Sequence, residues 1–367
     1  MAQMRIGSGK GTDFLSTAPE TSGNLLGAFS VDHRGGLWRR SHALATPGTS
    51  SLLRMIKAVS MRNGQAMDFE EDIRQHVLAN LPHQPSDRGE LMAKRASDVL
   101  IFYINWLGRF VPARPRAVQC STALSSNQLA TDLRYKPALD QIVAFLRAGT
   151  EITAHLSRDI NYGYQGTSTA KPKKRRRDLD LLLNDWGVHH LHLSTVIETD
   201  GFVRRNGPLL FAVFRPENAY LIDIMNHDDW TREYVIQVMV REWPDAGRVH
   251  EIKGEGLSHP LSEQDRKILR SKHVFAAFEI DGKNYMPAAG LTSAGTSIRA
   301  TLSEATVLRT VRWFEDHMRE SPDYIATTLA ENGVVPPQNP DFHFEFFPNG
   351  GYGIVEKQTG FRFRLKP

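Results

Sequence analysis

Three histidines stand within a four-residue stretch of the chain, in the segment DWGVHHLHLS. The chain has 14 histidines among 367 residues, so this grouping is denser than composition alone would produce. Alternate residues of a strand share a face, which would place His190 and His192 side by side, about 7 Å apart. Because imidazoles exchange protons near neutral pH, such a pair could serve as an acid and a base. His227 follows a later apolar segment and could approach the same face if the intervening strands pair.

Cationic side chains flank the histidine segment. Arg204 and Arg205 precede the next apolar run, and Lys253 follows a later helical stretch. RNA cleavage without a metal needs an acid, a base and fixed positive charge that stabilises the phosphorane. We therefore expect a metal-independent ribonuclease that uses no cofactor. Its candidate catalytic residues are His190, His192, His227 and Lys253, and its candidate phosphate-binding residues include Arg204 and Arg205.

Two other functions are compatible with the same residues. A divalent metal could be held by His190, His192 and His227 together with Asp228 or Asp229, because imidazoles and carboxylates are common ligands of Zn²⁺ and Mn²⁺. That arrangement would make the protein a metal-dependent hydrolase. Alternatively, the histidines lie on a solvated sheet face and bond locally, and the protein is a non-enzymatic module that binds nucleic acid or protein.

The positive charge of the chain is concentrated in one segment, 171–177, which reads KPKKRRR. The chain has a formal net charge of +4, and subtracting the six charges of this segment leaves −2 for the remainder. Such a run attracts phosphates without sequence preference, although many basic runs are simply solvated linkers. RNA or another nucleic acid is therefore the expected partner, and a protein regulator is a second one. The expected contacts are Lys171, Lys173, Lys174, Arg175, Arg176 and Arg177.

The order of elements over 188–230 resembles the strand core of RelE/ParE-type toxins. It runs from the histidine strand through Arg204 and Arg205 to the paired runs LLFAVF and AYLIDIM, and it ends at His227. The resemblance implies a ribonuclease-like sheet and a toxin-like or defence-like role. The long N-terminal region and the helix expected over 228–242 depart from those small proteins. The segment LLNDWGVHHLHLS resembles uncharacterised bacterial proteins, which implies no mechanism.

The helices and strands predicted around the candidate site residues indicate an α+β protein. Its N-terminal region is helical, its central sheet is mixed or antiparallel with flanking helices, and its C-terminal region has helices and antiparallel strands. Length suggests two or three domains. We expect a flexible segment over 1–50, a mainly helical region over 51–160, a basic linker over 161–177, a histidine-bearing α+β region over 178–260, and a C-terminal α+β region over 261–367.

Hydrophobic periodicity places the individual elements. The predicted helices cover 50–59, 68–81, 87–110, 137–147, 178–186, 228–242, 302–318 and 322–331. The predicted strands cover 116–120, 188–195, 209–214 and 219–225, followed by a hairpin within 272–286 and a terminal meander of two or three strands.

The cysteine content and the termini bear on the cellular compartment. Cys120 is the only cysteine, so no disulfide can form within the chain. The first residues lack the apolar core of a signal peptide, and no stretch approaches the roughly 20 apolar residues of a membrane span. We therefore expect a cytoplasmic protein with no membrane partner. Its oligomeric state is left open.

Overall fold

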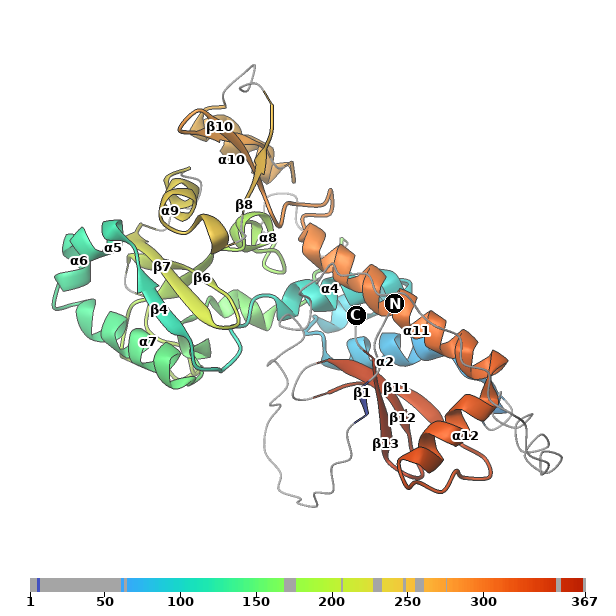
Figure 1. Cartoon of the computed structure of the whole chain (residues 1–367). Coiled ribbons are helices and arrows are strands. Elements are labelled where there is room, and N and C mark those ends of the chain that lie inside the picture. Colours follow the sequence, from blue (N-terminus) through green and yellow to red (C-terminus); the bar gives the residue numbers. More distant parts are fainter. Residues whose placement is uncertain are drawn as a thin grey trace. The chain divides into compact units, whose positions relative to one another are not determined.

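The computed structural model shows an α+β protein, as the sequence predicts (Figure 1). It describes residues 5–6, 61–62, 65–167, 176–205, 207–226, 233–246, 249–254, 261–274, 276–347 and 351–365. The predicted flexible segment 1–50 and the helix expected over 50–59 lie almost wholly outside these residues. None of the helices in the described ranges is long and apolar enough to cross a membrane.

The chain forms two units, each of which draws on separate stretches of sequence. Unit 1 comprises Met1–Asn80, Arg95–Leu100 and Glu304–Pro367. Unit 2 comprises Leu81–Lys94 and Ile101–Ser303, and it contains the histidine segment. The division between the units passes through two helices, α4 (Ala96–Leu107) and α11 (Ile298–Glu320).

Unit 1 contains an antiparallel sheet in the order β1-β13-β12-β11. Its elements are β1 (Arg5–Ile6), β2 (Met61–Arg62), β3 (Gln65–Ala66), α2 (Phe69–Asn80), α12 (Pro322–Glu331), β11 (Phe342–Phe346), β12 (Tyr352–Glu356) and β13 (Phe361–Leu365). The alternating pattern FHFEF buries Phe342, Phe344 and Phe346 on one face, as a half-buried strand requires. The backbone N–H of Phe344 donates a hydrogen bond to the carboxylate of Asp72, a residue of α2. This carboxylate therefore occupies the outer edge of β11. The predicted terminal meander is therefore confirmed.

Unit 2 contains the central sheet, with the strand order β4-β7-β6-β5. Its strands are β4 (Ala117–Cys120), β5 (His189–His192), β6 (Leu209–Phe214) and β7 (Asn218–Met225). The pair β4–β7 is parallel, whereas β7–β6 and β6–β5 are antiparallel, so the sheet is mixed. The histidine strand β5 is an edge strand, which leaves one side of it open to elements outside the sheet.

The central strand β6 is buried along its whole length because apolar side chains cover both faces of the sheet. Leu210 and Ala212 belong to the core on one face, while Phe211 and Val213 belong to the core on the other. This explains why its sequence, LLFAVF, is a continuous apolar run rather than an alternating one.

The helices of unit 2 end at residues that the sequence marks clearly. The helix α7 (Lys136–Ala148) ends at Gly149, which adopts a left-handed φ of 77°. The helix α8 (Leu181–Trp186) begins at the capping residue Asp180 and ends at Gly187, with φ of 69°. The other helices are α3 (Arg88–Met92), α5 (Thr122–Ser126), α6 (Gln128–Thr131), α9 (Tyr234–Glu242) and α10 (Glu263–Ser271).

A second, three-stranded antiparallel sheet completes unit 2, in the order β8-β10-β9. Its strands are β8 (Val249–Ile252), β9 (Phe278–Ile280) and β10 (Lys283–Pro287). The predicted hairpin is present here, because Asp281 and Gly282 turn β9 into β10, both with positive φ.

Three predicted elements differ in extent from those in the structure. The helix expected over 87–110 is two helices, α3 and α4; both keep apolar residues buried, so periodicity alone does not reveal the break between them. The histidine strand spans only β5, because the chain then enters a loop closed by the bridge between Ile197 and Val203. The helix expected over 302–318 is longer and matches α11.

Candidate histidine site

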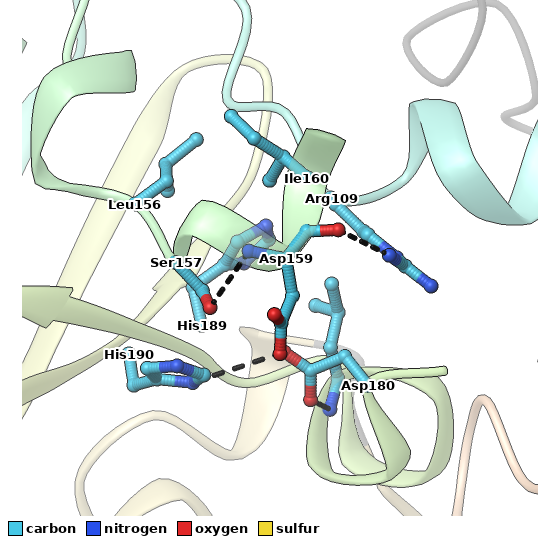
Figure 2. Close-up of a pocket in the computed structure, with 9 residues that line it drawn as sticks. Arg109, Leu156, Ser157, Asp159, Ile160, Asp180, His189 and His190 are labelled. Atoms are coloured by element: carbon cyan, nitrogen blue, oxygen red, sulfur yellow. Dashed lines mark hydrogen bonds and ion pairs between the residues drawn. The ribbon is translucent and has the colours of Figure 1, made fainter. Parts of the chain in front are cut away.

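A small hollow lies beside the outer edge of β5, lined by side chains from four parts of unit 2 (Figure 2). His189 and His190 come from the strand, Asp180 from the cap of α8, Asp159 from the short turn Arg158–Asn161, and Arg109 from the segment after α4. The volume open to the centres of water molecules is about 20 Å³, enough for about one water. A group the size of a nucleotide does not fit inside this hollow.

His190 and Asp180 form the central pair of this site. Nδ1 of His190 lies 3.8 Å from Oδ2 of Asp180, and the two side chains are 13% and 20% exposed. Asp180 is held in place because its Oδ1 also accepts a hydrogen bond of 3.1 Å from the backbone N–H of Leu183. At 3.8 Å the two groups are close enough to interact through their charges but too far apart for a hydrogen bond.

The charges around Asp180 favour its ionised form. Burial raises the pKa of this carboxyl, but the positive charge of His190, the Leu183 N–H and the charges of Arg109 and His189 together bring the pKa below its usual value. Asp180 is therefore a carboxylate at neutral pH.

Arg109 shapes the floor of the site through backbone contacts. Its Nη1 donates to the carbonyl oxygens of Asp159 at 3.0 Å, Tyr162 at 2.9 Å and Arg177 at 3.2 Å. The side chain is buried, so one guanidinium links the turn that carries Asp159 to the end of the basic segment. Arg109 therefore positions the site, and its charge also favours the ionised form of Asp180.

The other histidines of the strand have different surroundings. The ring centroids of His190 and His192 are 6.2 Å apart, so the two do lie side by side. His192 is buried, and its carbonyl oxygen accepts a 2.9 Å hydrogen bond from Nδ1 of His155, whose pKa burial lowers despite this bond. His189 points to the other face of the sheet, where its ring packs against Phe214 at 5.3 Å. Of the three strand histidines, His190 is the most accessible one.

The last two residues of the basic segment are held against unit 2. Arg176 donates to the buried carboxylate of Asp178 and to the carbonyl oxygen of Gln165. Arg177 donates from Nε to Asp159 at 2.8 Å and lies 3.8 Å from the ring centroid of Tyr162. The other basic residues of the segment lie outside the described residues; they are Lys171, Lys173, Lys174 and Arg175.

Arg204, Arg205 and Lys253 are not among the residues that line the hollow. Arg204 is exposed, with its Nε 3.7 Å from Glu198, and Arg205 is also exposed. Lys253 is exposed at the end of β8, in the three-stranded sheet. His227 lies outside the described residues, so its approach to the histidine strand stays a prediction.

Three residues of the site were not singled out by the sequence: Asp180, Asp159 and Arg109. Asp180 could be recognised from the sequence as a helix cap, because an acidic residue at the start of a helix, three positions before Leu183, is a common cap. A cap that also faces a strand histidine cannot be distinguished by that rule from one that faces solvent. Nothing in the sequence near Arg109 or Asp159 indicates a site.

The metal alternative depends on residues that the structure leaves out. Among the described residues, no group of three or more His, Cys, Asp or Glu side chains is arranged to hold a metal ion. The ligands that this alternative needs, His227, Asp228 and Asp229, fall outside that part of the chain. The alternative is therefore still open.

Comparison of the chain with protein families, with curated proteins and with solved structures finds no match in any of the three. The resemblance to RelE/ParE-type toxins is therefore a prediction from the sequence. Any statement of function must be argued from the geometry of this chain.

Proposed function

We propose that the protein is a metal-independent ribonuclease in which His190 transfers protons with the help of Asp180. The observation that carries this proposal is the pair itself, a partly exposed imidazole near a hydrogen-bonded carboxylate, with both residues lining a small hollow. His190 would take the proton of an RNA 2′-hydroxyl through Nε2, while Asp180 stabilises the imidazolium that forms. The 2′-oxygen would attack phosphorus, the P–O5′ bond would break, and the leaving 5′-oxygen would take a proton from water, which gives a 2′,3′-cyclic phosphate and a 5′-hydroxyl.

The basic segment supports RNA as the substrate. Arg177, its last residue, is bound to Asp159, and Asp159 lines the same hollow as His190. The four charges of Lys171, Lys173, Lys174 and Arg175 therefore belong to a stretch of chain that begins next to this site. Such charges hold single-stranded RNA through its phosphates, in a manner that weakens with salt.

The cellular setting proposed from the sequence is compatible with this activity. A single cysteine, Cys120, fits a reducing compartment, and a cytoplasmic ribonuclease would meet RNA there. An enzyme of this kind could damage the RNA of its own cell, so we also propose a protein regulator as a second partner.

The test is cleavage of a labelled RNA oligonucleotide in the presence of a chelator. We expect cleavage by the parent protein, a loss of about 100-fold or more for His190→Ala, and a smaller loss for Asp180→Asn, since Asp180 acts through His190. The matched control is His250→Ala, because His250 is an exposed histidine on β8 in the same unit. Equal cleavage by the parent and by a folded His190→Ala variant would remove the proposal.

Two other outcomes would point to the alternatives. Salt-dependent RNA binding without turnover would identify a non-enzymatic binding module. Hydrolysis that the chelator abolishes and Zn²⁺ or Mn²⁺ restores would indicate the metal-dependent enzyme.

A further inference from the structure

The ribonuclease proposed above needs positive charge beside the reacting phosphate. The cationic residues that flank the histidine segment in the sequence are not among those that line the hollow. Asp159 and Asp180 line it together with His190, and their two carboxylates would repel a phosphate that approached without a cation. Arg109 also lines the hollow, but it is buried and its Nη1 is already bonded to three carbonyl oxygens. An exposed cation next to the hollow is therefore the remaining requirement.

Arg177 is held beside the hollow through its backbone. Its N–H donates to Oε1 of Gln165 at 3.3 Å, and its carbonyl oxygen accepts from Nη1 of Arg109 at 3.2 Å. Because Arg109 is a lining residue of the hollow, the backbone of Arg177 is bonded directly to the wall of the site. The position of this residue is thus fixed before its side chain makes any contact.

The guanidinium of Arg177 is oriented by two further side chains. Its Nε donates to Oδ1 of Asp159 at 2.8 Å, and its Nη1 donates to the hydroxyl of Tyr162 at 2.5 Å. Its Cζ lies 3.8 Å from the centroid of the Tyr162 ring, so the ring covers one face of the guanidinium. Asp159 lines the same hollow as His190 (Figure 2). One carboxylate therefore connects this guanidinium to the site.

Two hydrogen-bond donors of this arrangement are left over. In the described part of the chain, no residue accepts a hydrogen bond from Nη2 of Arg177, whose side chain is 45% exposed. The Tyr162 hydroxyl accepts from Arg177 and keeps its own hydrogen to donate, with no acceptor among the described residues. The two groups are bonded to each other, so both donors lie within reach of one phosphate.

We propose that Arg177 and Tyr162 bind the scissile phosphate of RNA beside His190. This rests on the proposed ribonuclease function and names the residues that hold the substrate at the same site. Nη2 of Arg177 and the Tyr162 hydroxyl would donate to the non-bridging oxygens, where negative charge builds up as the 2′-oxygen attacks phosphorus. A guanidinium already fixed by Asp159 and Tyr162 loses little side-chain entropy on binding. Arg177 thereby differs from the rest of the basic segment, which we expect to attract RNA without a defined orientation.

The first experiment measures the binding of a dinucleotide that contains a single phosphate and cannot be cleaved. A 2′-deoxy dinucleotide with an ordinary phosphodiester is compared with the same compound carrying a neutral methylphosphonate, by ligand-observed NMR with the full-length protein. We expect the parent to prefer the phosphodiester by about 10-fold, as one charge-assisted hydrogen bond would give. Arg177→Ala should abolish this preference. Tyr162→Phe should reduce it, and it leaves the pair between Arg177 and Asp159 intact, so its effect cannot come from a released carboxylate.

The matched control is Arg134→Ala. Arg134 pairs with Asp132 at 2.6 Å, and its Cζ lies 5.2 Å from the centroid of the Tyr135 ring, so it has the same kinds of partner as Arg177. It is not among the residues that line the hollow, and its replacement removes the same charge. The variant should keep the full preference for the phosphodiester. No preference in the parent, or an equal preference in the parent and in a folded Arg177→Ala variant, would overturn the proposal.

A second experiment separates this proposal from the ribonuclease proposal. Cleavage of a ribodinucleotide by the parent and by Arg177→Ala is measured with a phosphodiester and with both diastereomers of a phosphorothioate. Arg177→Ala should cleave the phosphodiester about 100-fold more slowly, and sulfur in place of the contacted oxygen should slow the parent more than this variant. Cleavage by Arg177→Ala at the parent rate would overturn the proposal and leave the role of His190 intact. A preference for the phosphodiester that depends on Arg177, in a protein that cleaves no RNA, would support the phosphate site and overturn the ribonuclease instead.

Discussion

Nε of Arg177 lies 2.8 Å from Oδ1 of Asp159, so an acidic residue that lines the histidine hollow holds the last residue of the basic segment. The neighbouring Arg176 donates a hydrogen bond to the carbonyl oxygen of Gln165. Gln165, Arg176 and Arg177 all belong to unit 2, which also contains the candidate site. Both ends of the linker predicted over 161–177 lie in unit 2.

The first prediction concerns the salt dependence of RNA binding. Replacing Lys171, Lys173 and Lys174 by Gln should weaken the binding of single-stranded RNA. It should also reduce the slope of log affinity against log salt by about 2, because each lost phosphate contact removes about 0.7. The measurement is fluorescence anisotropy with an uncleavable oligonucleotide between about 50 and 200 mM salt. An unchanged slope would show that these charges do not contact the RNA.

The second prediction concerns the stability of the protein in acid. Asp180→Asn keeps the helix cap, since Asn caps as well as Asp, and it removes only the charge beside His190. The loss at pH 7 should be about 1 kcal/mol in the free energy of unfolding. The pKa of Asp180 is lowered, so its ionised form contributes stability above its unfolded pKa, and this contribution is lost as the pH falls through the folded pKa.

Urea unfolding of the parent and of Asp180→Asn at several pH values checks this expectation. The two curves of stability against pH should approach each other as the pH falls below the ordinary aspartate pKa of about 3.9, and they should meet only below the lowered pKa of the folded state, where the carboxyl is protonated in both states. A constant difference at every pH would mean that the variant acts through packing rather than charge.

The third prediction concerns the attachment of α8, the helix that Asp180 caps. Nε of Arg270 donates to Oδ2 of Asp185 at 2.8 Å, and both side chains are almost fully buried, at 3% and 4% exposure. Its guanidinium also lies 3.9 Å from the ring centroid of Trp186. Arg270→Leu would leave the carboxylate buried and unpaired, and should lower the free energy of unfolding by about 3–5 kcal/mol at pH 7.

The pH dependence of the Arg270→Leu variant distinguishes this cause from a packing defect. Burial raises the pKa of Asp185, and Arg270 opposes that rise. Without the arginine, the folded state should take up a proton more readily than the unfolded state, so the loss of stability should shrink as the pH falls. The double variant Asp185→Asn/Arg270→Leu should recover part of the loss at pH 7. Arg241→Leu, at the exposed pair with Asp281, should change stability far less.

The fourth prediction concerns Gly149, the residue that ends α7. Its φ of 77° is left-handed, and a Cβ atom there would lie 2.6 Å from Cδ and from N of Pro115. Gly149→Ala should therefore lower the free energy of unfolding by about 1–2 kcal/mol through backbone conformation alone. The close approach of the new Cβ to Pro115 should lower it further. In contrast, Gly89→Ala in α3 meets no atom within 4 Å and should gain up to about 1 kcal/mol. Thermal unfolding of both variants measures these changes in stability. Equal changes in the two variants would contradict the left-handed conformation of Gly149.

Much of the fold could be predicted from the sequence because its determinants are local. The alternation of FHFEF, the apolar run LLFAVF, and the glycines at 149 and 187 each reflect a rule that operates over a few residues. The side-by-side placement of His190 and His192 follows from the same alternation, and their ring centroids are indeed close, at 6.2 Å.

The composition of the site was decided by the tertiary structure. His190 meets Asp180 because α8 turns the chain back beside β5, and Arg109 arrives from a segment about 70 residues earlier. Local rules fix the direction of a side chain relative to its own helix or strand, but not which distant element packs against it. Which distant element packs against a side chain depends on the free energy of burial summed over the whole chain. A short window of sequence therefore cannot reveal that element.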